Sequence, residues 1–127
     1  MTIDQAIKSA DKLKNNLIDE GIKVRLLSEL DGRIYSEITN PYAETAFNGY
    51  GDDTPRSTEL LVPYPYDGLY VTFLEKEICR INNEIPKYNG LAEIFNESYE
   101  AFKLWYVRTH KITTPETPKI TFPMRRY

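Results

Sequence analysis

The chain has 127 residues, of which 41% are hydrophobic and 13% aromatic, and this length fits a single domain. No apolar run approaches the roughly 18 residues that a membrane-spanning helix needs, and the first residues lack the hydrophobic stretch of a secretion signal. Cys79 is the only cysteine, so no internal disulfide can form. These features argue against a membrane protein or a disulfide-stabilised secreted protein. We expect a protein that is made and kept in a cytoplasm-like compartment.

Charge is divided unevenly along the chain. Residues 1–102 contain eighteen acidic and ten basic side chains, a formal charge of −8, whereas residues 103–127 contain one acidic and six basic side chains, a formal charge of +5. Oppositely charged ends favour head-to-tail contact between copies, or docking of the basic end onto an acidic partner. A solvated, lysine-rich tail is the alternative interpretation of the same charges.

Two helices are predicted in the first forty residues. Thr2 can cap the first helix, with Gln5 at the reciprocal position of a capping box, and apolar residues recur at helical spacing as far as Leu13. A second helix is expected from about Asp19 to Ile38. Its apolar stripe consists of Ile22, Leu26, Leu27, Leu30, Ile34 and Ile38. Gly32 lies inside this helix, and we interpret it as a place where another backbone packs closely.

Residues 40–65 are predicted to form a long connection. Prolines and glycines leave no room for a helix of useful length, yet the segment is too apolar for a solvated linker. Its apolar and aromatic members are Tyr42, Phe47, Tyr50, Leu60, Leu61, Val62 and Tyr64. Two alternatives remain open: the segment folds back over its own helices, or it packs against a neighbouring molecule. A short strand near Phe47 or at residues 60–62 is compatible with the pattern.

Two further helices follow. The third is expected to begin around residues 65–67 and to run to about Asn83, with Glu77 as the exception on an otherwise apolar side. The fourth is expected to begin near Pro86 or Asn89 and to run to about Thr109. Its stripe is interpreted as core and consists of Tyr88, Leu91, Ala92, Phe95, Tyr99, Phe102, Trp105 and Tyr106. The expected fold class is therefore mainly α, a four-helix bundle-like domain with a long loop at about 40–65.

The last segment is predicted to be an extended basic arm, residues 111–127, which follows a helical connector domain at 1–110. Three prolines exclude a helix, and residues 119–122 alternate in the manner of a strand before Pro123. Such a segment could dock on a partner by strand addition, or it could be a floppy terminus.

We find no convincing catalytic, metal or cofactor site in the sequence. His110 is the only histidine and Cys79 is distant from it in sequence, so neither a zinc site nor a Cys-His pair can be assembled. Asp52 and Asp53 could offer carboxylates to a divalent ion, but a turn explains them equally well. The Gly49-Tyr50-Gly51 sequence lacks the Lys-Ser/Thr of a phosphate loop. We therefore expect a protein that is not an enzyme and carries no cofactor.

Three segments together resemble the head–tail connector (neck adaptor) proteins of tailed phages and prophages of Gram-positive bacteria. They are residues 26–35 (LLSELDGRIY), residues 58–63 (TELLVP) with Tyr66-Asp67, and residues 87–110, which begin with KYN, end with RTH and carry Phe95, Asn96, Tyr99, Phe102 and Tyr106 between them. The resemblance spans roughly residues 1–110, is weak at 42–57 and does not extend past Lys111. It implies a helical adaptor that forms a ring, commonly of about twelve subunits, beneath the portal. The implied location is the virion neck, after synthesis in the bacterial host cytoplasm.

The resemblance implies as partners other copies of the chain, the portal protein and the tail-completion or tail-terminator proteins, with DNA passing through the lumen without specific binding. An acidic body would suit such a channel wall, because repelled DNA slides without sticking. The predicted interface residues are Phe47, Tyr50 and Tyr64 in the loop, and Ile120, Phe122, Arg125 and Arg126 in the arm. The alternative function is a nucleic-acid-binding packaging or regulatory accessory that uses the basic arm.

Overall fold

The computed structural model describes residues 1–40 and 46–110. Its regular elements are α1 (Ile3–Leu13), α2 (Glu20–Ile34), a π-helical turn η1 (Tyr35–Thr39), a 3-10 turn η2 (Tyr66–Gly68), α3 (Leu69–Ile81) and α4 (Ile85–Thr109). Within those two ranges there is no strand, and the prediction of a mainly α protein is confirmed. The predicted arm, with Ile120, Phe122, Arg125 and Arg126, lies outside the described residues.

The first helix begins and ends as the sequence predicts. The hydroxyl of Thr2 accepts a hydrogen bond from the Gln5 amide, and the Gln5 side chain accepts one from the Thr2 amide, which completes the capping box. The apolar stripe of the helix is buried as far as Ala10, with Ile3, Ala6 and Ala10 fully shielded from solvent, whereas Leu13 at its end is 65% exposed.

The second helix differs from the prediction at its C-terminal end. Asp19 caps α2, but the α-helix stops at Ile34 and the chain continues as the π-helical turn η1, where the Asn40 amide donates to the Tyr35 carbonyl at 2.8 Å. Ile38 remains in the core, whereas Ile22 at the other end is 42% exposed. The interpretation of Gly32 was wrong for the described part of the chain, since no atom from another segment lies within 4 Å of the position of an added Cβ.

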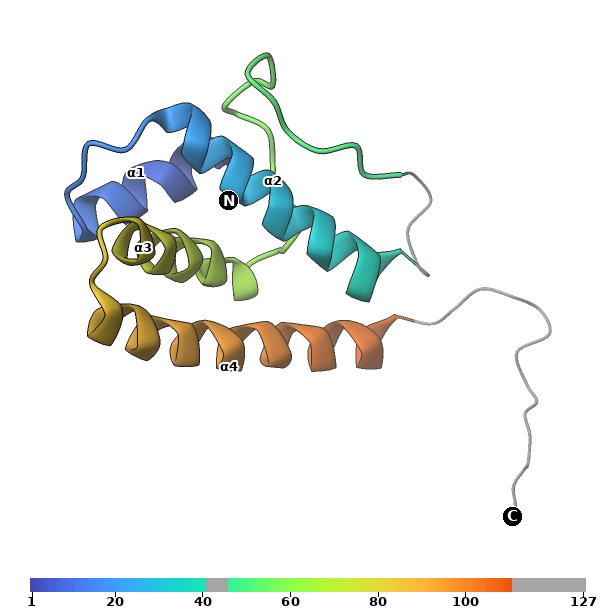
Figure 1. Ribbon diagram of the computed structural model, residues 1–127. Coiled ribbons are helices and arrows are strands. Elements are labelled where there is room, and N and C mark those ends of the chain that lie inside the picture. Colours follow the sequence, from blue (N-terminus) through green and yellow to red (C-terminus); the bar gives the residue numbers. More distant parts are fainter. Residues whose placement is uncertain (41–45, 111–127) are drawn as a thin grey trace, which may run out of the picture.

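Helix α3 lies at the centre of the fold. It packs against α1, α2 and α4, while α4 makes no direct backbone approach to α1 or α2 and meets α2 through the following turn η1. Figure 1 shows this arrangement, with α4 along one side of α3 and the pair α1 and α2 on the other. The third helix is shorter than predicted, because the 3-10 turn η2 occupies its first residues and Asn82 ends it.

The long connection folds back over its own helices in its described part, residues 46–65. Thr2 and Glu59 form a single antiparallel bridge, the Ile3 amide donates to the Thr58 carbonyl at 3.0 Å, and the Leu60 amide donates to the Met1 carbonyl at 3.0 Å. Leu60 and Val62 consequently enter the core, where they are 6% and 0% exposed. One isolated bridge replaces the short strand that the pattern allowed.

The core combines residues from every helix and from the loop. Among its fully enclosed side chains are Leu27 and Ile34 from α2, Tyr70 and Leu74 from α3, and Phe102 from α4. Within the two described ranges, no helix combines the length and the apolar character that crossing a bilayer would require.

Candidate functional site

A buried carboxylate fastens the loop to the helices. Asp31 on α2 is 0% exposed, and both of its oxygens accept hydrogen bonds. Oδ1 accepts from the Tyr70 hydroxyl at 2.5 Å, while Oδ2 accepts from the Tyr50 hydroxyl at 2.5 Å and from the Leu61 amide at 3.1 Å. The Tyr70 hydroxyl in turn accepts from the Val62 amide at 2.8 Å. We call these five residues the loop clamp, because they join α2, α3 and the loop.

The chemistry of the loop clamp is that of a structural anchor. Burial raises the pKa of Asp31, and the hydrogen bonds from Tyr50, Tyr70 and Leu61 oppose that rise. Burial and the neighbouring carboxylate also raise the pKa values of Tyr50 and Tyr70, so neither phenol provides an accessible base. A carboxylate whose oxygens are occupied by three protein donors has no obvious place for a substrate.

The start of the described loop is held by a glycine that the local geometry requires. Gly49 has φ +90°, a conformation that side chains with a Cβ rarely adopt, and an added Cβ would lie 3.0 Å from the Ser28 hydroxyl oxygen. The same hydroxyl accepts a hydrogen bond from the Tyr50 amide at 3.0 Å. Phe47 packs edge-on against Tyr50, with ring centroids 5.1 Å apart, and faces Tyr35 at 6.4 Å.

The end of the loop meets the end of α4 in an aromatic cluster. The Tyr66 ring lies 5.2 Å from Trp105 and 6.0 Å from Phe102, measured between centroids. His110, from which the predicted arm departs, stacks on Tyr106 at 3.8 Å and lies 6.0 Å from Trp105. His110, the C-cap of α4, is therefore connected to Tyr66 by ring contacts through Trp105.

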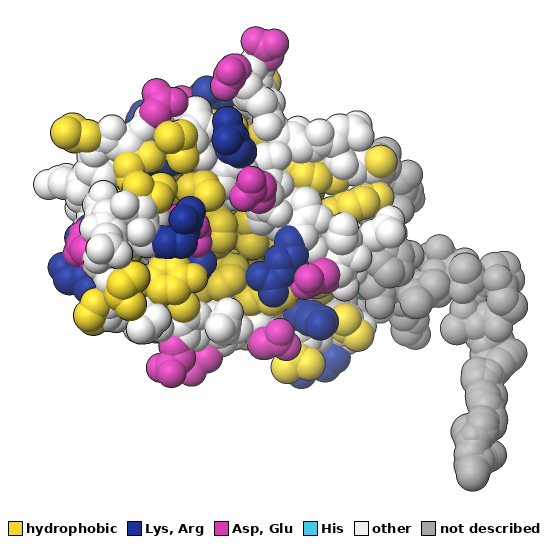
Figure 2. Space-filling view, viewed as in Figure 1, with side chains coloured by type: hydrophobic (Ala, Val, Ile, Leu, Met, Phe, Trp, Pro, Cys, Tyr) yellow, Lys and Arg dark blue, Asp and Glu magenta, His cyan; other side chains and the backbone are white. Residues whose placement is uncertain are grey.

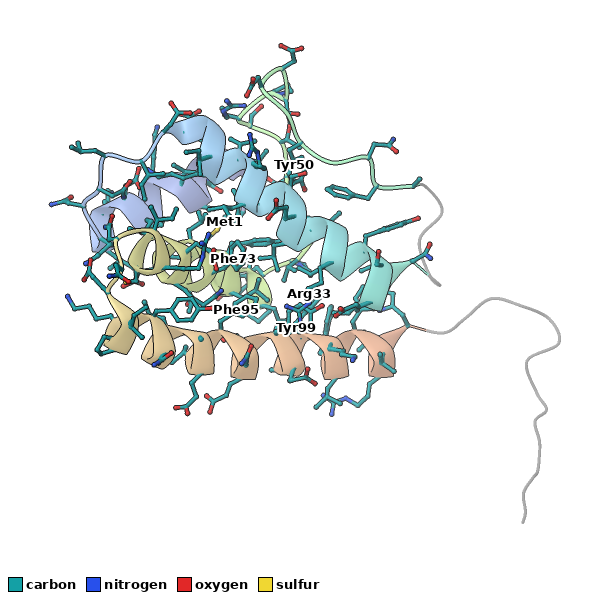
Figure 3. All side chains as sticks on the ribbon, in the orientation of Figure 1. Met1, Arg33, Tyr50, Phe73, Phe95 and Tyr99 are labelled. Atoms are coloured by element: carbon teal, nitrogen blue, oxygen red, sulfur yellow. The ribbon has the colours of Figure 1, made fainter. Side chains whose placement is uncertain are left out.

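The three loop residues predicted to form an interface are placed differently from one another. Tyr50 directs its hydroxyl inward to Asp31, and Figure 3 shows this side chain between the loop and α2. Phe47 is half-buried on its own aromatic neighbours. Tyr64 is 86% exposed, next to the Tyr66 ring that contacts α4. Of the three, Tyr64 therefore offers the largest free surface to a partner.

A second surface feature is a groove of about 240 Å³ between α2 and α3. Leu26, Leu30 and Phe73 supply its apolar part, and Glu29, Arg33, Glu77 and Arg80 complete its lining. Figure 2 shows the apolar side chains gathered at the centre of this face with charged groups around them. Arg33 also contacts α4, because its guanidinium lies 4.3 Å from the centroid of the Tyr99 ring (Figure 3).

Glu77, the acidic exception on the third helix, is buried and forms ion pairs with two cations that neutralise its charge. Its carboxylate accepts from Lys76 Nζ at 2.6 Å and from Arg80 Nε at 2.7 Å. Burial opposes ionisation of Glu77, but these two hydrogen bonds outweigh it, and the pKa of Glu77 is lowered. Lys76 is only 8% exposed, and its Nζ also faces the Phe73 ring, 4.8 Å from the centroid.

The candidate catalytic and metal residues do not come together. Asp52 and Asp53 lie exposed in a turn, the His110 ring is stacked on Tyr106, and burial raises the pKa of the Cys79 thiol. Across residues 1–40 and 46–110, no three His, Cys, Asp or Glu side chains are grouped so that they could hold a metal ion.

Sequence reasoning missed Asp31 and Lys76. Asp31 carries a usable signal, because it lies four residues after Leu27 and three before Ile34, inside the apolar stripe of α2. Lys76 carries none, since it flanks the stripe of α3 in the way that an ordinary exposed lysine does.

No family model, curated protein or solved structure matches the chain. A function can therefore be proposed only from the arrangement of the described residues and from the three segments that carry the sequence resemblance.

Proposed function

We propose that the protein is a structural virion component, a head–tail connector or neck adaptor. Its four helices act as a bundle-like body that forms a ring, of about twelve copies, around the DNA channel. The portal protein binds on one side of the ring and the tail-completion proteins bind on the other. The loop and the basic arm supply contacts with these neighbours, and no step of the role requires catalysis.

The observation that carries this proposal is that the three resembling segments contact one another in pairs. Asp31, from the segment 26–35, accepts a hydrogen bond from Leu61 of the segment 58–63. Tyr66, beside that second segment, packs against Trp105 of the third. Arg33 of the first segment lies over Tyr99 of the third. Residues that are far apart in sequence thus form one connected structural unit, and this supports reading the resemblance as a whole.

The ring contacts between the end of the loop and the end of α4 also favour an assembly role. Tyr64 is exposed two residues before Tyr66, whose ring packs on Trp105, and His110 stacks within the same aromatic cluster. A partner that contacts Tyr64 would thus lie close to the origin of the arm. Two contact elements at one end of a small body suit a subunit that holds a neighbour from two sides.

The net charge of the body is compatible with a channel through which DNA passes. Residues 1–102 carry a formal charge of −8, which repels phosphate and limits adhesion of DNA to the wall. Nucleic-acid binding by the basic arm would instead favour the packaging or regulatory accessory.

The proposal is tested by locating the protein and by measuring what it binds. Purified full-length chain should form rings with a central channel in electron micrographs, and it should co-purify with the portal protein encoded in the same genome. Antibody labelling of virions should mark the neck. Labelling of the capsid or of the tail tip would overturn the proposal. Salt-sensitive, tight binding to duplex DNA without portal binding would replace it with the nucleic-acid accessory.

A further inference from the structure

A larger groove has no occupant in the described chain. It has a volume of about 410 Å³ and lies among α1, α3 and the first half of α4. Leu13, Leu91 and Ile94 supply apolar surface, and Cys79 and Glu75 of α3 lie within it. Leu13 is 65% exposed and Ile94 51% exposed, so both present apolar surface to solvent at the groove.

A second, smaller hollow lies farther along α4. Its volume is about 170 Å³, and it is lined by Ser98 and Ala101 of α4 together with residues of η2 and the start of α3. Ile94, Ser98 and Ala101 are spaced four and three residues apart, so they share one face of the helix. From Gly90 to Ala101 the helix rises about 16 Å, which an extended segment of about five residues spans. The small side chains at positions 90, 98 and 101 leave room for such a segment.

The charged residues that line the groove are Lys14, Lys87 and Glu75. Its two lysines, Lys14 and Lys87, both approach Glu84, at 2.7 and 3.4 Å. In contrast, Glu75 in the groove and Glu93, Glu97 and Glu100 on the exposed side of α4 make no ion pair within the described ranges. Glu97 follows Ile94 by three residues and precedes Ala101 by four, so it borders the groove directly. The complementary ligand is a short extended segment with apolar side chains flanked by cations.

The chain contains a segment of this composition. Residues 119–126 (KITFPMRR) place Ile120, Phe122 and Met124 between Lys119 and the pair Arg125 and Arg126, and prolines at 118 and 123 exclude a helix. No sheet edge exists in the described residues to receive this segment by strand addition, whereas the groove offers apolar contact and opposite charge.

We propose that the α4 groove of one copy receives the segment 119–126 of a second copy. Phe122 or Ile120 enters between Leu13 and Ile94, and the flanking cations pair with Glu75, Glu93 and Glu97. This inference rests on the proposed ring. A contact between two different surfaces repeats head to tail from copy to copy, and the copies form a closed ring when the rotation between neighbours divides a full turn evenly. The inference adds to the proposed function the two surfaces through which neighbouring copies would bind, the α4 groove and the segment 119–126.

Charge reversal with rescue tests the pairing. The variant Arg125→Glu/Arg126→Glu should weaken self-association of the full chain at least tenfold in sedimentation equilibrium, and Glu93→Lys/Glu97→Lys should do the same. Combining all four substitutions should restore most of the lost association. The control Lys8→Glu/Arg25→Glu changes the net charge as much as the arm variant does, but on exposed residues of the body. It should leave association close to wild type. Failure of the combined variant to recover would overturn the inference.

A crosslink identifies which copy supplies the arm. In a Cys79→Ala background, the variant Ile94→Cys/Phe122→Cys treated with a short bis-maleimide should give a ladder of covalent oligomers. Each single-cysteine variant should give dimers at most. Circularised monomers without a ladder would show that the arm docks on its own chain and would overturn the assignment to a second copy.

These outcomes separate the inference from the proposed function. If rings form normally in the Arg125→Glu/Arg126→Glu variant, the groove contact is wrong, but the proposed neck role is unaffected. If self-association depends on the arm but the protein binds no portal protein and is missing from the neck, the groove contact is supported and the proposed function is wrong.

Discussion

The hydroxyl of Tyr70 lies 2.5 Å from Oδ1 of Asp31, and both side chains are completely shielded from solvent. Tyr70 belongs to the central helix α3 and Asp31 to α2, and the hydroxyl also accepts a hydrogen bond from the Val62 amide of the loop. The hydroxyl of Tyr70 thus connects three parts of the chain, which are α3, α2 and the loop. A buried polar group of this kind stabilises the fold only while all its partners are present.

Tyr70→Phe should therefore destabilise the protein by about 1–3 kcal/mol, because it leaves one oxygen of Asp31 and the Val62 amide without partners in the core. Urea denaturation measures the loss. The matched control is Tyr99→Phe, which removes a hydroxyl that donates at 2.6 Å to Glu37. Glu37 is 46% exposed and keeps Arg33, so the control should lose much less. Equal losses in the two variants would contradict the importance of burial.

The titration of Asp31 should appear in the pH dependence of stability. Burial raises the pKa of this carboxyl above its ordinary value of 3.8. The folded protein then binds the proton more readily than the unfolded chain, so the stability contributed by the group is full below about pH 3.8 and is lost as the pH rises through the folded pKa.

The free energy of unfolding, measured relative to Asp31→Asn, should therefore fall as the pH rises through that window. The acidic groups with lowered pKa values, Glu37, Glu77 and Glu84, have the opposite effect but are present in both proteins and largely cancel. A difference that increases with pH would show that the hydrogen bonds to the carboxylate outweigh its desolvation.

Gly49 and Gly51 provide a matched pair for the loop. Gly49→Ala should destabilise the protein by about 1–2 kcal/mol, because φ is +90° and the new Cβ would lie 3.0 Å from the Ser28 oxygen. Gly51→Ala should change stability by less than about 0.5 kcal/mol, since an added Cβ meets nothing within 4 Å. Hydrogen exchange at the Tyr50 amide should accelerate in the first variant alone. Unchanged exchange there would show that the loop does not depend on this turn.

Truncation after His110 separates folding from assembly. The described core contains no residue beyond this point, so circular dichroism should show a helical, cooperatively unfolding protein. Co-purification with its partner should be lost, because the basic arm is absent. If the truncated chain assembles like the full chain, the arm is not a docking element.

The helices could be predicted from the sequence because their signals are local. The capping box at Thr2 and Gln5 lies within four residues, and the stripe of α4 repeats over several turns, so elements of both helices follow from spacing alone. The end of α2 could not be predicted, since Ile38 continues the apolar spacing whether the turn that carries it is α or π.

The loop clamp could be predicted only in part. An aspartate inside an apolar stripe signals a buried partner, but Tyr50, Leu61 and Tyr70 are 19 to 39 residues away and periodicity says nothing about them. For the same reason the inward hydroxyl of Tyr50 and the outward ring of Tyr64 look alike in the sequence. Tertiary contacts alone distinguish them.

The ion pair of Lys76 and Glu77 should show strong energetic coupling. Glu77→Leu leaves the Lys76 ammonium, 8% exposed, without its carboxylate and should cost about 3 kcal/mol. Lys76→Met should cost less, because Glu77 keeps Arg80 at 2.7 Å. The double variant should be more stable than the sum of the two losses predicts, since apolar side chains can replace a buried pair without leaving a charge behind.

Urea denaturation of the four proteins completes this double-mutant cycle. Arg80→Met is the control, and it should cost less than about 1 kcal/mol because Arg80 is 52% exposed and water replaces it. Strictly additive losses for Lys76 and Glu77 would mean that the three aromatic rings around Nζ, and not the carboxylate, hold the lysine in the core.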